Sequence, residues 1–266
     1  MNKIQYLLAF LQCCLAVPAL SQDIFPFTEA LFVAAPQRYG REAVYTDQLA
    51  YQLYTNQLKT PAEGASFAPS LQWQAVKADS AHRLVRPGGG RGWGFGRGGY
   101  FYLTYSSDRA RPALLHIKGN SGLYFNGTPH TGDPYGSGWL YIPVQLKKGL
   151  NEIYVRGAMI TASLRFPDKP LQLVTEDPTM PAIVTGQTQD TLQGAVVVIN
   201  SSNREWKGLR MRATLAGKEI TAALPSIPPM SSRKVPFSFD AGAVNTVGKP
   251  VCHLVLLDKN KMLDEA

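Results

Sequence analysis

The sequence has 266 residues, of which 45% are hydrophobic and 17% charged, a balance that is typical of a folded globular protein and excludes a largely disordered chain. The formal net charge is +8, but Lys and Arg are scattered outside one loop, so solubility explains the charge better than nucleic-acid binding. Two of the three cysteines lie in the first 14 residues and the third is Cys252, which excludes a disulfide framework in the rest of the chain.

The N-terminal segment has the order of a secretory signal. Lys3 is followed by an apolar run from Ile4 to Val17 and then by small residues ending at Ser21. We therefore predict a signal peptide over residues 1–21 and a secreted or periplasmic protein. The apolar run is too short to cross a bilayer core of about 30 Å, so no membrane attachment is expected after the signal is removed.

Residues 22–66 have no clear period. The stretch from Arg41 to Leu58 mixes helix-compatible spacing with strand-forming Tyr and Val. We treat residues 22–66 as a lead-in segment that can add a strand to the domain that follows.

From Ser66 onward, short aromatic and β-branched runs are separated by Gly, Pro, Asn and Asp, which is typical of an antiparallel sandwich. Asn126-Gly127 predicts a tight hairpin turn, and Lys147-Lys148-Gly149 predicts another reversal. We predict a jelly roll over residues 67–168. Its clearest strands are expected at 100–105, 113–118, 122–125, 140–146, 152–157 and 161–166.

Two closely spaced prolines, Pro167 and Pro170, predict a linker to a second domain over residues 169–266. Strands expected at 195–199, 209–215, 234–239 and 253–257 favour an immunoglobulin-like sandwich. Met262-Leu263 would begin a returning strand, so we expect a truncated sandwich with an unpaired edge. The predicted fold class is all-β, with two consecutive antiparallel β-sandwiches.

Three short motifs in the first predicted sandwich carry a family likeness. They are Leu123-Tyr124-Phe125-Asn126-Gly127, Gly132-Asp133-Pro134-Tyr135-Gly136 and Pro143-Val144-Gln145-Leu146-Lys147-Lys148-Gly149-Leu150-Asn151. Together they resemble the galactose-binding-like jelly roll at the N-terminus of some exported bacterial hydrolases. Residues 195–200 and 228–239 resemble the Ig-like domain that follows it there. The resemblance covers about residues 67–260. It implies a parent protein with a serine α/β-hydrolase domain of prolyl-oligopeptidase or esterase type.

No catalytic constellation is recognisable in these residues, so whether the chain is an enzyme is left open. A serine hydrolase of that type needs the motif Gly-x-Ser-x-Gly, which does not occur. Ser121 and Ser137 are the nearest matches, and both lie in segments with the composition of turns. The activity implied for the parent therefore cannot be assigned to any residue here.

Loop aromatics and a few polar residues are the candidate ligand-binding groups, because sugar sites pair an aromatic face with polar side chains that fix orientation. Asp133 can cap its own loop, bind a sugar hydroxyl or help to hold a calcium ion, and the cap is the favoured interpretation. No histidine has metal-ligand spacing, and no cofactor is predicted. The candidate residues are Trp93, His130, Asp133, Tyr135 and Trp139.

The loop 86–99 superficially resembles an arginine-glycine RNA-binding segment. The export signal argues against RNA, so no nucleic-acid partner is predicted, and a loop that rims an active site of a hydrolase domain is preferred.

Two functional hypotheses follow. The first is a non-catalytic accessory region that positions or supports a downstream hydrolase domain of the same parent chain. The alternative is a free-standing carbohydrate-binding module that grips polysaccharide through Trp93, Tyr135 and Trp139.

Overall fold

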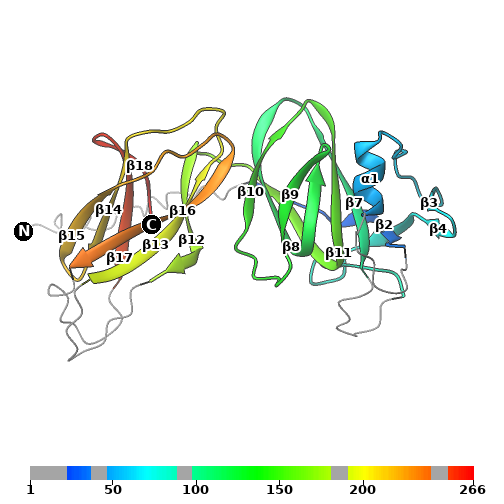
Figure 1. Ribbon diagram of the computed structural model, residues 1–266, viewed down its shortest axis with the longest axis horizontal. Helices are drawn as coiled ribbons and strands as arrows, with labels where there is room; N and C mark the ends of the chain where they lie inside the picture. Colours follow the sequence, from blue (N-terminus) through cyan, green and yellow to red (C-terminus); the bar gives the residue numbers. More distant parts are fainter. Residues whose placement is uncertain (1–22, 37–46, 89–97, 181–190, 241–250) are drawn as a thin grey trace, which may run out of the picture.

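The computed structural model describes residues 23–36, 47–88, 98–180, 191–240 and 251–266. The predicted signal peptide, Trp93 and most of the glycine-arginine loop lie outside the described residues. In the described part, all strand pairings are antiparallel and the strands form two β-sandwiches that lie side by side (Figure 1). The predicted all-β fold class is confirmed.

The first sandwich contains eleven strands and a single described helix. Helix α1 spans Gln48–Tyr54. The strands are β1 (Ile24–Pro26), β2 (Glu29–Ala34), β3 (Ser66–Ala68), β4 (Leu71–Gln72), β5 (Gln74–Lys77), β6 (Leu84–Val85), β7 (Gly99–Ser107), β8 (Arg111–Phe125), β9 (Thr128–Asp133), β10 (Tyr141–Leu146) and β11 (Gly149–Arg165).

Two long strands, β8 and β11, run through both layers of this sandwich. Residues 120–125 of β8 and 149–157 of β11 lie in one layer with β9, β7, β2 and β5, which we call the helix-side layer. Residues 111–118 of β8 and 159–165 of β11 lie in the other layer with β10, β1 and β6, which we call the junction-side layer. One sheet therefore folds over itself to form a two-layered core.

Glycines make the bend between the layers. Gly119 has φ +78°, and a Cβ on it would lie 2.4 Å from the carbonyl oxygen of Met159. The pairing of β8 with β11 changes register on both sides of Gly157, which marks a bulge. The prediction of separate strands joined by a turn at 119–121 is thus wrong, because close backbone contact at these glycines bends continuous strands.

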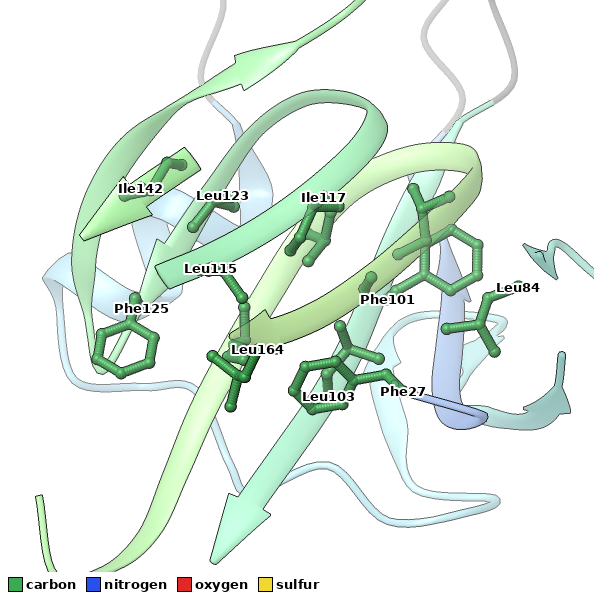
Figure 2. Packing of buried hydrophobic residues seen from close by; sticks show 14 of the residues in the cluster. Phe27, Leu84, Phe101, Leu103, Leu115, Ile117, Leu123, Phe125, Ile142 and Leu164 are labelled. Carbon is green, nitrogen blue, oxygen red and sulfur yellow. The ribbon is translucent and has the colours of Figure 1, made fainter. Parts of the chain in front are cut away.

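The core between the layers follows the alternation of side chains along each strand. Phe101 and Leu103 of β7 point inward from one layer and meet Leu115 and Leu164 from the other (Figure 2). Phe27, which precedes β2, belongs to the same cluster and is 3% exposed. Strand β2 pairs with both β5 and β7. Residues in the range 22–66 therefore help to build the first sandwich.

The second sandwich has seven described strands in two sheets, the strand number of a constant-type immunoglobulin fold. One sheet has the order β12 (Leu171–Thr179), β13 (Thr191–Asn200) and β16 (Ser231–Asp240). The other has the order β15 (Lys218–Ala223), β14 (Leu209–Leu215), β17 (Cys252–Asp258) and β18 (Lys261–Glu265). A single cluster of buried residues, including Val196, Met211 and Phe237, fills the space between them.

The returning strand expected near the C-terminus is β18, and it pairs with β17. Its Asp264 carboxylate accepts hydrogen bonds from Lys169 Nζ at 2.8 Å and from the backbone N–H of Leu173 at 2.7 Å. These bonds tie β18 to β12 in the opposite sheet, so the edge expected to be unpaired is anchored in the fold.

Candidate functional site

The loop between β9 and β10 holds two of the predicted ligand-binding residues, Tyr135 and Trp139, and Asp133, the last residue of β9, organises it from inside. Asp133 is 5% exposed, and its two carboxylate oxygens accept bonds from the N–H and hydroxyl of Ser137 and from the N–H of Gly138, at 2.7–3.0 Å. Burial opposes ionisation, yet these bonds keep the pKa of Asp133 below its ordinary value. The geometry is that of a loop cap, the interpretation favoured by the sequence.

The other predicted residues do not converge on Asp133. His130 pairs with Leu123 and Asp133 pairs with Asn120, so their side chains leave opposite faces of β9. Tyr135 is 94% exposed and Trp139 is 50% exposed. The loop therefore presents two aromatic side chains to solvent.

A groove lies elsewhere, on the outer face of the helix-side layer under α1. It has a volume of about 550 Å³, within the range of about 300–1,000 Å³ that is usual for small-ligand pockets. Its wall on the helix side comes from α1 and the segment after it, and its floor comes from β8, β9 and β11. The lining residues are Ala50, Leu53, Tyr54, Asn56, Leu58, Thr60, Tyr124, Asn126, Gly127, Pro129, Glu152 and Tyr154.

Helix α1 is short, so tertiary contacts must hold it in place. Asp47 is its N-cap and accepts a bond from the N–H of Ala50 at 3.0 Å. The second carboxylate oxygen of Asp47 accepts the hydroxyl of Tyr100 at 2.7 Å and lies 3.2 Å from the guanidinium of Arg156. One carboxylate thus caps the helix and fixes it to β7 and β11.

Side chains on the same outer face form a second apolar cluster beneath the helix. Trp73 and Phe67, from the segment around the β3–β4 hairpin, pack there with Leu49 of α1. Tyr100, Tyr102 and Tyr154 supply the sheet side of the cluster. The helix and the hairpin segment cover this face only in part, and the groove is the uncovered remainder.

The floor of the groove carries a carboxylate held by tyrosines. Glu152 Oε1 accepts the hydroxyl of Tyr102 at 2.8 Å and that of Tyr154 at 3.5 Å. Burial first, and then the neighbouring Glu152 carboxylate, raise the pKa of both tyrosines well above the ordinary value. Both phenols therefore stay protonated donors at neutral pH, and the second oxygen of Glu152 accepts no hydrogen bond from another described residue.

Asn126 lines the groove but serves the hairpin turn. Its side-chain oxygen accepts the N–H of Glu152 at 3.0 Å, and its amide nitrogen donates to Asn151 at 2.9 Å. Asn126 itself has φ 47°, as the predicted tight turn requires. This turn fixes the position of Glu152 along the groove.

Sequence reasoning missed the groove because its residues are scattered over the helix, two hairpin strands and β11. Tyr124 and Asn126 were noticed only as strand and turn residues, and the segment that forms α1 had no clear period. One signal was present: Tyr100 and Tyr102 alternate with Phe101 and Leu103, which shows that both faces of β7 are covered.

Comparison with known proteins gives distant structural likenesses. A protein of Bacteroides fragilis described as a β-galactosidase aligns with 93% of this chain at 13% identity and a TM-score of 0.40. A family 2 (GH2) β-galacturonidase of Eisenbergiella tayi aligns with 92% of the chain at 10% identity and a TM-score of 0.37. A glycosyl hydrolase family 2 member from Bacteroides cellulosilyticus aligns with 91% of it at 17% identity and a TM-score of 0.34.

The chain spans 40%, 42% and 35% of the lengths of these three proteins, respectively. No protein-family model and no curated protein matches the sequence. A TM-score below 0.5 does not carry an activity from those proteins to this chain. None of the three is described as a prolyl oligopeptidase or an esterase, so the parent expected from the sequence finds no support among them.

Two further features bear on the class of site. Among the described residues, no group of three or more His, Cys, Asp or Glu side chains lies close enough to hold a metal ion. Within the same ranges, no helix is long and apolar enough to cross a membrane.

Proposed function

We propose that this chain is a non-catalytic, carbohydrate-binding pair of β-sandwiches whose ligand site is the groove under α1. The observation that supports this proposal is an aromatic groove of about 550 Å³ with one carboxylate held at its floor. Aromatic surfaces pack on the apolar C–H face of a sugar ring, and a few polar groups fix its orientation. Tyr124 and Tyr54 provide the surfaces, and Glu152 provides a fixed acceptor.

The arrangement favours binding over hydrolysis. Most glycosidases use two carboxyl groups about 5–9.5 Å apart. Glu152 is the one carboxylate among the described lining residues, and the nearby Asp47 is engaged with Tyr100 and Arg156. A lone carboxylate that already accepts two phenol hydroxyls is suited to hold a sugar hydroxyl.

The loop aromatics Tyr135 and Trp139 remain a second proposed contact surface for glycan. They are exposed on a loop that Asp133 holds rigid, but they are not accompanied by a described cavity. The groove is preferred because it joins aromatic surface, a volume of about 550 Å³ and a hydrogen-bonded acceptor in one place.

Calorimetric titration of the full chain with a panel of soluble oligosaccharides tests the proposal. We expect Tyr124→Ala to weaken binding at least about tenfold, since loss of a stacking ring removes about 1–3 kcal/mol. Tyr54→Ala serves as the variant that cannot disturb the core, because Tyr54 is 89% exposed, and it should weaken binding about threefold.

Tyr135→Ala tests the competing surface on the β9–β10 loop, and it should bind like the unmodified chain if the groove is the ligand site. Loss of binding in Tyr135→Ala with retention in the two groove variants would transfer the site to the β9–β10 loop. Absence of binding to every oligosaccharide in the panel would overturn carbohydrate binding itself.

An accessory role in a longer hydrolase is the second proposal, and it is compatible with the first. A region that positions another domain must itself be rigid, and Tyr141 links the two sandwiches: it belongs to one cluster with Val174 and Ile199, and its hydroxyl donates to Glu176 at 3.1 Å. The rigidity of this link can be measured separately from glycan binding.

A further inference from the structure

The charge of the groove narrows the class of glycan that it can hold. Its described lining contains one ionisable carboxylate, Glu152, and no Lys, Arg or His. The guanidinium of Arg156 acts electrostatically on Tyr124 of the lining, but it is paired with the Asp47 carboxylate at 3.2 Å. An anionic group on a ligand would thus meet a fixed negative charge with no cation in the lining to offset it.

The hydrogen bonds of Glu152 also favour a neutral ligand over an anionic one. Tyr102 and Tyr154 donate to Oε1, which leaves Oε2 as an acceptor that requires a donor from the ligand. A sugar hydroxyl can donate, whereas an ionised carboxylate or sulfate group can only accept. Because the Tyr102 hydroxyl bonds to Oε1 at 2.8 Å, moving the carboxylate away from an anionic ligand would break this bond.

We propose that the groove selects neutral glycans and rejects uronate and sulfated sugars through Glu152. This inference rests on the proposed function and goes further, because it names the ligand class and the residue that sets it. The net charge of +8 attracts anionic polymers to the molecule as a whole. Discrimination against them therefore has to come from the local carboxylate.

The test compares matched pairs of tetrasaccharides, galactose with galacturonic acid and glucose with glucuronic acid, by calorimetry in low salt. We expect the neutral member of a binding pair to bind at least about tenfold more tightly than its uronate. The difference should shrink at about 0.3 M salt, because exposed charges are then screened.

Glu152→Gln removes the charge but keeps an oxygen that can accept from Tyr102, so the fold should be retained. In this variant the preference for the neutral sugar should fall to less than about threefold. Glu219→Gln is the control, because Glu219 lies in the second sandwich, 3.8 Å from Arg212, and its replacement should leave the preference unchanged.

Equal affinity of the unmodified chain for neutral and uronate tetrasaccharides would overturn this inference, but it would leave the proposal of carbohydrate binding intact. A preference that persists in Glu152→Gln would also overturn it, since another group would then set the selection. If neither member of any pair binds, the proposed function and the inference fall together.

Discussion

The two outer faces of the first sandwich carry similar aromatic side chains but are covered in different ways. On the junction-side layer, Tyr141 stacks on His116 at 4.4 Å between ring centroids, and the second sandwich covers this face. On the helix-side layer, the ring centroids of Tyr102 and Tyr154 lie 4.9 Å apart, and among the described segments α1 and the β3–β4 segment cover them.

The difference shows that one apolar face of a β-sandwich can form a domain interface while the other is left with a groove. A whole domain seals the junction-side face and leaves Tyr141 5% exposed. A seven-residue helix is too small to seal the opposite face, so a groove remains beside Tyr124. The extent of the cover, rather than the chemistry of the sheet, separates the two faces.

The largest expected change in the free energy of unfolding comes from removing Tyr141 from the interface between the two sandwiches. Tyr141→Ala removes the stack on His116, the contact with Arg165 and the bond to Glu176, and should lower the free energy of unfolding by about 3 kcal/mol. The two sandwiches should then unfold in two separate calorimetric transitions. Tyr141→Phe keeps the ring and loses only the hydroxyl bond, so it should cost about 1 kcal/mol or less.

Unchanged cooperativity in Tyr141→Ala would contradict the role of this residue as the link between the sandwiches. It would also remove the support that the link gives to an accessory, positioning role.

A smaller loss of stability is expected from removing the contacts that hold α1 on the helix-side layer. Asp47→Ala removes the helix cap and the contacts with Tyr100 and Arg156, and should cost about 1–2 kcal/mol. Amide hydrogen exchange over residues 48–54 should accelerate, and glycan binding in the groove should weaken with it. Asp47→Asn is the matched comparison, because Asn keeps the helix cap while its amide nitrogen can neither accept from the Tyr100 hydroxyl nor pair with Arg156, so it isolates the cap from these two contacts.

If Asp47→Ala speeds exchange in α1 without any loss of binding, the helix does not form a wall of the site. Slow exchange in both variants would mean that Leu49 and Gln52 hold the helix without the cap.

The sequence was sufficient for the features that depend on local pattern. The strand at 100–105, which is part of β7, the Asn126-Gly127 turn and the cap formed by Asp133 all follow from neighbours within a few positions, and the structure contains each of them. The bend at Gly119 is not the turn that the composition suggests, since only the pairing with β11 shows that β8 bends there and continues as one strand.

The groove could not be predicted, because it depends on pairings between distant segments. Glu152 and Tyr102 meet through the β7–β11 register, and Asp47 reaches Tyr100 across 53 positions of the sequence. The extent to which α1 covers the sheet depends on this packing, and no local sequence pattern predicts it. Local composition instead drew attention to Tyr135 and Trp139, which are exposed at the edge of the sealed face.

The smallest expected effect is the pH response of the loop at that edge. Hydrogen bonds from Gly138 and Ser137 keep the pKa of Asp133 low in spite of burial. An acid with a lowered pKa in the fold stabilises it fully above the unfolded value near 4, and this contribution is lost as pH falls through the lowered value. Protection of the Ser137 and Gly138 amides should therefore drop as the pH falls below about 4 toward the lowered pKa.

Nuclear magnetic resonance exchange measurements, corrected for the intrinsic pH dependence, would detect this drop. His116 also bonds to Gly138, with Nε2 2.8 Å from the carbonyl oxygen, and burial lowers the pKa of its ring, so its protonation at acid pH also destabilises this loop. Asp133→Asn removes only the part of the drop that comes from Asp133, so the drop should be clearly smaller in this variant. A drop of equal size in this variant would mean that the acid response arises elsewhere and that Asp133 does not hold the exposed aromatics in place.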